Sequence, residues 1–269
     1  MTLLASWVAV DSRNPSSIYI MSDSRIRWNA TTKFDHGKKI FACKNSPDIF
    51  GYCGDVLFPS IVLNQIVDMA DQGLLFEENW SCEQKSNAVA TQLYLAFRNY
   101  PKDVESIFAK TLHIIHCSRD KDVNFYCRKI NWTAEKIWKV ETHDFESYSD
   151  KLFVVGSGAN EFLEKFEKYK NGDNQKTSRS LFHCFTDTLS DIKDIHCGGA
   201  PQLAGLYRIQ NGRYYGIINN NKRYFQGVES DELLNFDKIE WRNELFEICD
   251  GYTMKIKDKA QRQPNPLKP

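Results

Sequence analysis

The chain has 269 residues, with 35 basic and 35 acidic side chains, so its formal net charge is zero. Hydrophobic residues make up 42% and charged residues 26% of the chain, which excludes a disordered polymer, a collagen-like repeat and a small disulfide-rich domain. The sequence pI near 7.0 gives no overall field that would attract nucleic acid or an anionic membrane, so neither is expected as a partner.

Segments 3–10, 18–22, 38–43 and 48–53 open the chain as two expected strand pairs. They are rich in apolar and β-branched residues, and turn-forming residues separate the members of each pair. The first of them is also the longest apolar run, far shorter than the roughly 20 residues that cross a bilayer. No basic residue precedes that run and Asp11 follows it, which argues against a secretory signal.

Two helices are expected next. Apolar residues recur at helical spacing from Leu63 to Ala70, and Gly73 closes this helix. Ser81 and Gln84 have the spacing of a capping box, which opens the second helix.

The second half of the chain repeats the order of strands, two helices and strands. Asn211-Gly212 is the strongest short signal for a hairpin. The expected strands are 111–117, 123–130, 136–140, 152–155, 203–209 and 214–218, and the expected helices contain residues 162–169 and 181–192.

Strands grouped with strands, and helices grouped in pairs, differ from the alternation of a parallel sheet. They predict an α/β chain of the α+β type, a four-layer α/β/β/α sandwich of two antiparallel sheets flanked by helix pairs. We expect one domain over residues 2–226 and a C-terminal extension over 227–269. The extension is expected to hold a helix through residues 244–248 and a Pro- and Lys-rich tail, 252–269, with five basic residues and one acidic residue.

Cysteine and histidine positions give no sign of a metal or redox centre. The eight cysteines are scattered singly without a CxxC pair, as reduced thiols would be. His113 and His116 lie three positions apart in an expected strand and so point to opposite faces. These features favour a cytoplasmic protein that uses no metal and no other cofactor.

Thr2 is the residue with the most suggestive chemistry. Met1 is removable before a small residue, and its loss would leave a threonine with a free α-amine. Such a residue combines a nucleophilic hydroxyl with a base whose ordinary pKa is about 7.7–8.0. A chain that begins Met-Thr is common, so the expectation depends on motifs further along.

Short motifs follow Thr2 in a definite order along the expected strands: Ser22-Asp23-Ser24-Arg25, Gly37-Lys38-Lys39-Ile40, Tyr52-Cys53-Gly54-Asp55, Val155-Gly-Ser-Gly158 and Asp194-Ile-His-Cys-Gly-Gly199. These motifs carry a resemblance to a known family. The chain resembles the β-type proteasome subunits and the bacterial HslV-type ring peptidases, which are N-terminal-nucleophile (Ntn) hydrolases. The resemblance covers roughly residues 2–226 and implies the Ntn-hydrolase fold.

The resemblance implies a role for each matching position. Thr2 would be the nucleophile, and Lys39 the lysine whose ammonium group stabilises the forming alkoxide. Asp23 would be the carboxylate that holds this lysine. Lys38 is the rival for the lysine role, because strand alternation lets only one of the two face the site. Gly54 would offer its backbone N–H to the oxyanion of the tetrahedral intermediate.

A second set of residues would orient the α-amine. Asp194 and Cys197 match this set, and Ser157 is a less certain member. The family usually has serine at position 197, and a thiol is a poorer hydrogen-bond partner for an amine. Leu3 also departs from the Thr or Ser that is common there. The expected substrate pocket has an apolar wall, although the same residues suit the core equally well: Ile26, Phe41, Tyr52 and Val56.

The implied activity is hydrolysis of peptide bonds by Thr2 after removal of Met1. The implied assembly is a ring, or stacked rings, of identical subunits, with any unfoldase or regulatory partner left open. Two other readings also stay open: a small-molecule amidohydrolase on the same fold, and an inactive proteasome-like scaffold or binding subunit.

Overall fold

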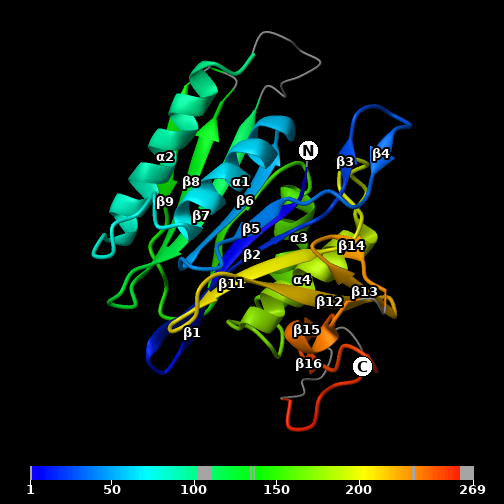
Figure 1. Cartoon of the computed structure of the whole chain (residues 1–269). Coiled ribbons are helices and arrows are strands. Elements are labelled where there is room, and N and C mark those ends of the chain that lie inside the picture. The colour runs from blue at the N-terminus through cyan, green and yellow to red at the C-terminus, as the bar shows by residue number, and fades with distance from the viewer. Residues whose placement is uncertain (1, 102–110, 134, 136, 232–233, 261–269) are drawn as a thin grey trace.

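The computed structural model describes residues 2–101, 111–133, 135, 137–231 and 234–260 (Figure 1). Within these ranges the protein is a mixed α+β fold with antiparallel sheets and four α-helices. None of the helices in the described ranges is long and apolar enough to cross a membrane.

The larger sheet has nine strands in the described part of the chain, in the order β10-β1-β2-β11-β12-β13-β14, and β15 and β16 join it beside β12. All of its pairings are antiparallel except that of β12 with β15. Its strands are β1 (Leu4–Asp11), β2 (Asn14–Ser22), β10 (Asp150–Val155), β11 (Gln202–Tyr207), β12 (Arg213–Asn219), β13 (Lys222–Phe225), β14 (Val228–Glu229), β15 (Trp241–Arg242) and β16 (Ile248–Cys249).

The second sheet has five strands in chain order, all antiparallel. A separate two-stranded hairpin, β3 (Ile26–Arg27) and β4 (Lys33–Phe34), stands out from the body (Figure 1). The five strands are β5 (Ile40–Ala42), β6 (Asp48–Gly54), β7 (Leu112–Arg119), β8 (Phe125–Trp132) and β9 (Trp138–Thr142).

Local sequence signals account for the ends of several helices. Helix α2 begins with the expected capping box: the Gln84 amide donates to Ser81 Oγ at 3.3 Å, and the Ser81 amide donates to Gln84 Oε1 at 2.9 Å. Gly73, with φ +70°, follows the end of α1. The helices are α1 (Leu57–Asp71), α2 (Cys82–Arg98), α3 (Ala159–Tyr169) and α4 (Ser178–Asp191).

Buried apolar side chains form three main clusters. One lies between α1, α2 and the five-stranded sheet, one lies between strands of the two sheets, and one lies between the nine-stranded sheet and α3 and α4 (Figure 1). Ile20 and Met21 are neighbours on β2 and belong to different clusters, because successive strand residues face opposite sides.

The helix expected through residues 244–248 is wrong. This segment is a turn followed by β16. Asn243 Oδ1 accepts hydrogen bonds from the amides of Leu245 at 3.1 Å and Glu247 at 2.9 Å, and Phe246 has φ +63°. A side chain that binds the local backbone competes with helix formation, and a positive φ prevents it.

The boundary expected at residue 227 falls inside a hairpin. Tyr224 of β13 pairs with Glu229 of β14, and β15 pairs with β12. The chain beyond residue 227 therefore continues the nine-stranded sheet. Residues 261–269 of the expected tail, and position 136 of an expected strand, lie outside the described residues.

Candidate active site

Thr2, Asp23 and Lys39 meet where three neighbouring segments begin or end. Thr2 precedes β1, Asp23 follows β2 and Lys39 precedes β5. Lys39 Nζ donates to Thr2 Oγ1 at 2.6 Å and to Asp23 Oδ1 at 2.8 Å. The three residues are 3%, 0% and 1% exposed, so this contact of hydroxyl, ammonium and carboxylate is shielded from water.

The Asp23 carboxylate has further donors. Its Oδ1 accepts from the Leu3 amide at 3.2 Å, and its Oδ2 accepts from the amides of Gly198 at 3.0 Å and Arg25 at 3.3 Å. Burial raises the pKa of Asp23, while Lys39 and the amides of Gly198 and Leu3 oppose the shift by stabilising the ionised form. The carboxylate is thus fixed in position on both oxygens.

Lys38 points elsewhere. Its Nζ lies 4.5 Å from the centre of the Phe41 ring and 5.3 Å from that of Tyr214, as in cation–π contacts. Of the two adjacent lysines, Lys39 is therefore the one beside Thr2.

Gly54 ends β6 close to this cluster. The Tyr52 amide donates to the Lys39 carbonyl at 3.1 Å, so the strand that carries Gly54 runs alongside the lysine segment. Gly54 has φ +98°, and a Cβ at this position would overlap the Thr111 carbonyl. Both features require glycine.

Ser157, Asp194 and Cys197 lie together. Cys197 Sγ is 3.5 Å from Asp194 Oδ2 and 3.6 Å from Ser157 Oγ. Burial raises the pKa of Asp194, but hydrogen bonds from Ser157, the His196 amide and Cys197 outweigh it, and the pKa falls below its usual value. Burial also raises the pKa of the Cys197 thiol to about 12, so it stays protonated.

The loop that carries Ser157 packs on the backbone of Thr2. The Gly158 amide lies 3.4 Å from the Thr2 carbonyl oxygen, and a Cβ on Gly156, which has φ +101°, would overlap that oxygen. Close approach of the two backbones therefore brings the group of Ser157, Asp194 and Cys197 next to the start of β1.

The expected pocket residues divide into two kinds. Phe41 and Tyr52 are 3% and 1% exposed and pack in the cluster under α1 and α2, so the structure assigns them to the core rather than to a ligand-contacting wall. Phe41 on β5 and Tyr52 on β6 both face the helices at these positions. Ile26 and Val56 are half-buried.

Gln202 belongs to the site, although none of the sequence motifs includes it. Its side chain is fully buried, and its Nε2 donates to the carbonyls of Asp23 at 3.1 Å and Gly37 at 2.7 Å. Its Oε1 accepts from the Lys39 amide at 3.2 Å. Gln202 thereby joins the backbones that carry Asp23 and Lys39, and a lone glutamine at a strand start gives no sequence signal for this.

Arg25 holds the loop that contains Gly198 beside the site through an ion pair and a hydrogen bond. It forms a two-point ion pair with Asp35, at 2.7 Å and 2.9 Å, and donates to the Cys197 carbonyl at 2.8 Å. Gly198, whose amide binds Asp23, is packed against the Arg25 guanidinium, where a larger side chain would overlap it.

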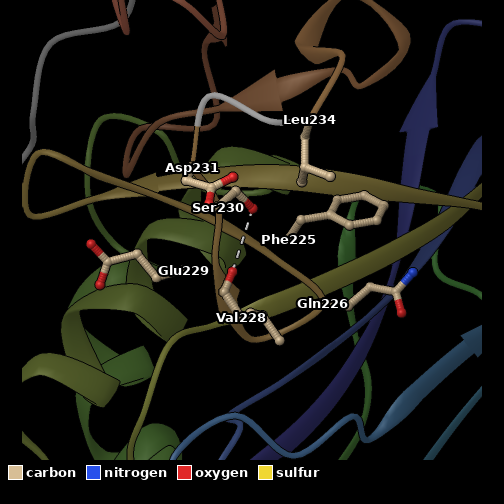
Figure 2. A pocket seen from close by; sticks show the side chains of 7 residues that line it. All are labelled: Phe225, Gln226, Val228, Glu229, Ser230, Asp231 and Leu234. Atoms are coloured by element: carbon tan, nitrogen blue, oxygen red, sulfur yellow. Dashed lines mark hydrogen bonds between the residues drawn. The ribbon is translucent and has the colours of Figure 1, made fainter.

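A hollow of about 440 Å³ adjoins this region across the β13–β14 turn. Gly227 in that turn packs on Ser24 and Gln202, and its carbonyl oxygen lies 3.1 Å from His36 Nδ1. In Figure 2, the apolar side chains of Phe225 and Leu234 lie on one side of the hollow, and the carboxylates of Glu229 and Asp231 lie on the other.

Comparison with known proteins bears on the fold. No family model matches the sequence, and no curated protein matches it. Among solved structures, a Gly-1 mutant of Anbu from Hyphomicrobium sp. strain MC1 is similar, with a TM-score of 0.54 at 11% sequence identity. The match covers 87% of this chain and 90% of the Anbu chain. The likeness is one of fold.

Proposed function

We propose that this protein is an N-terminal-nucleophile hydrolase that cleaves amide bonds, in peptides above all, with Thr2 as the nucleophile after removal of Met1. The observation that carries the proposal is the buried contact of Lys39 Nζ with Thr2 Oγ1 at 2.6 Å and with Asp23 at 2.8 Å. Burying a lysine and an aspartate beside a hydroxyl costs free energy. The arrangement is explained if the hydroxyl becomes an alkoxide during the reaction, because the buried ammonium group would stabilise that negative oxygen.

The fold supports the same proposal. The three apolar clusters fit a four-layer α/β/β/α sandwich, the architecture of Ntn hydrolases. The likeness to Anbu, a proteasome-like protein, agrees with it.

The chemistry would proceed in two steps. Thr2 Oγ1 attacks the substrate carbonyl carbon, and the free α-amine of Thr2 takes the hydroxyl proton while the Lys39 ammonium stabilises the negative oxygen. The Gly54 N–H would stabilise the oxyanion of the intermediate. The amine product leaves with the proton, and water then hydrolyses the ester on Thr2 to release the acid and restore the hydroxyl.

Ser157, Asp194 and Cys197 would position the α-amine. The lowered pKa of Asp194 keeps a negative charge near that amine, which would stabilise the ammonium ion formed when the amine takes the hydroxyl proton.

The test is a comparison of the Met-free wild type with Thr2→Ala and Thr2→Ser. Removal of Met1 is first verified by intact mass, and each protein is then treated with a β-lactone that acylates hydroxyl nucleophiles and assayed on peptide and small-amide reporters. We expect one acyl group on Thr2 of the wild type, none on Thr2→Ala, and residual activity in Thr2→Ser. Loss of the nucleophile lowers the rate by several orders of magnitude.

An unmodified Thr2 in the Met-free wild type, or wild-type turnover in Thr2→Ala, would overturn the proposal. If the protein hydrolyses small amides but not peptides, Thr2 remains the proposed nucleophile, and the proposed substrate class changes from peptides to small amides.

A further inference from the structure

A second cavity, of about 330 Å³, lies near the C-terminal end of β1, whereas Thr2 lies at the N-terminal end. Ala9 and Val10 of β1 contribute to its lining, so it is roughly 20 Å along the strand from the Thr2 site. The loop before α4, the first turn of α4 and β15 supply its polar groups. This distance makes it independent of the proposed hydrolase chemistry.

The charge of this cavity is one-sided. Lys176, Arg179 and Arg242 line it, and none of the described residues that form its lining is acidic. The carboxylates that balance the arginines are not part of the lining. Glu240 forms an ion pair with Arg242, and the charge of Glu247 stabilises the protonated form of Arg179. Burial lowers the pKa of Arg179, and the nearby Arg242 lowers it further, because the two guanidinium groups repel each other.

The hydroxyls of Ser149 and Ser178 also line the cavity. Their oxygens accept from the Val10 amide at 2.9 Å and from Trp7 Nε1 at 3.1 Å, so each O–H can be directed at a ligand.

The Nε of Arg242 is buried without a hydrogen-bond partner, and the side chain of this residue is 11% exposed. Its two terminal nitrogens are used by Glu240 and by the Phe246 carbonyl. Arg242 therefore contributes its charge to the cavity wall, rather than an N–H that a ligand in the cavity can reach.

The start of α4 adds to these donors. Thr177 caps the helix, with its Oγ1 accepting from the Ser180 amide at 3.2 Å. The N–H groups of Ser178 and Arg179 belong to the first turn, which has no intrahelical acceptors, and both residues line the cavity.

We propose that this cavity binds a phosphate group, either as inorganic phosphate or as the phosphate of a small monoester. A tetrahedral oxyanion matches three cations and several N–H and O–H donors in a volume that admits little more than a small ligand. Lys176 is exposed at the entrance, with its Nζ 4.7 Å from the centre of the Tyr148 ring, and provides the first electrostatic contact.

The test titrates inorganic phosphate or AMP into the full chain at low ionic strength and follows backbone amides by NMR. Sodium chloride at matched ionic strength is the reference. We expect saturable shifts at residues 176–180 and 242–246, a loss of affinity of at least fivefold in Lys176→Gln and at least tenfold in Arg179→Gln, and no change in Lys139→Gln. Lys139 is a matched exposed cation on the five-stranded sheet.

Tighter binding of AMP than of phosphate would assign the site to a monoester, and the reverse would assign it to the free anion. Equal shifts with chloride, or equal losses in Lys176→Gln and Lys139→Gln, would overturn the proposal. If Arg179→Gln fails to fold, the comparison of the two lysine variants still decides.

Discussion

Lys39 and Lys38 are adjacent in the chain and have opposite surroundings, which gives a sharp test of the site. Lys39→Ala removes the ammonium group that contacts Thr2 and Asp23, and we expect kcat/KM to fall by about 100-fold or more, as for loss of a transition-state donor. Lys38→Ala loses contacts with aromatic rings and the attraction of Asp68, all away from Thr2, and should keep activity within about threefold. Steady-state kinetics on the same reporter, with melting temperatures as a control for folding, makes the comparison. Equal losses in both variants would contradict it.

Gln202 is predicted to hold Lys39 in register with Asp23. Gln202→Leu removes the side-chain partners of the buried Gly37 carbonyl and the Lys39 amide, and one of the two donors to the Asp23 carbonyl, so the free energy of unfolding should fall by about 2–4 kcal/mol. Urea unfolding measures this.

Gln202→Glu provides a pH-dependent version of the same test. The buried glutamate would face the carbonyls of Asp23 and Gly37, so its pKa in the folded protein should rise above the usual value. Stability is then highest below the unfolded pKa of about 4.3 and falls as pH rises through the raised pKa. Melting temperatures and kcat/KM measured between pH 5 and pH 8 should both decline more steeply than in the wild type. A pH-independent difference from the wild type would contradict the prediction.

At the scale of elements, a buried ionic network joins α2 to the five-stranded sheet. Asp48 of β6 accepts from His116 Nε2 at 2.8 Å and lies 3.6 Å from Lys85 Nζ of α2. Burial raises the pKa of Asp48, but the hydrogen bond and charge of His116 and the charge of Lys85 outweigh it, and the pKa lies below its usual value. This carboxylate therefore contributes stability above its unfolded pKa, and the contribution is lost as pH falls through the lower folded value.

Asp48→Asn should accordingly lower the free energy of unfolding at pH 7 by about 3 kcal/mol, since it breaks a buried ion pair. The difference from the wild type should narrow as pH falls below about 4. Urea unfolding at pH 7, 5 and 3 checks this, with the exposed Asp122→Asn as the control. A constant difference at all three pH values would show that Asp48 acts through packing alone.

At the scale of the whole molecule, exposed apolar residues gather near the site. Trp28 and Phe34 of the β3–β4 hairpin are 65% and 47% exposed, and Ile195 is 55% exposed. Arg27 donates to the Ile195 carbonyl at 3.0 Å, which links the hairpin to the loop of Asp194. Such a patch is typical of a protein interface.

We predict self-association through this surface, in keeping with the ring assembly that the family resemblance implies. Sedimentation at low micromolar concentration should reveal an oligomer, and Trp28→Asp should weaken association at least tenfold. Ile209→Asp is the control, because Ile209 is 88% exposed and lies beyond β11 rather than on the hairpin. A single species of 31.2 kDa for the wild type would refute the assembly.

Local patterns were enough for the four helices, most of the long strands and the mixed α+β class. Ser81 with Gln84 predicts the start of α2, and Gly73 the end of α1, because caps depend on residues within one turn. Strand alternation and paired helices depend on neighbours along the chain in the same way. The segment 244–248 was missed because an asparagine side chain and one positive φ outweighed its helical pattern.

The arrangement around Thr2 depended on contacts between residues far apart in the chain. Sequence motifs proposed Thr2, Asp23 and Lys39, but alternation alone left Lys38 and Lys39 equivalent, and only the packing of β5 against β6 and β11 turned Lys39 inward. The same packing placed Phe41 and Tyr52 in the core and gave Gln202 its three partners. Secondary structure follows from interactions within a few residues, whereas the direction of a buried side chain follows from what the rest of the fold leaves beside it.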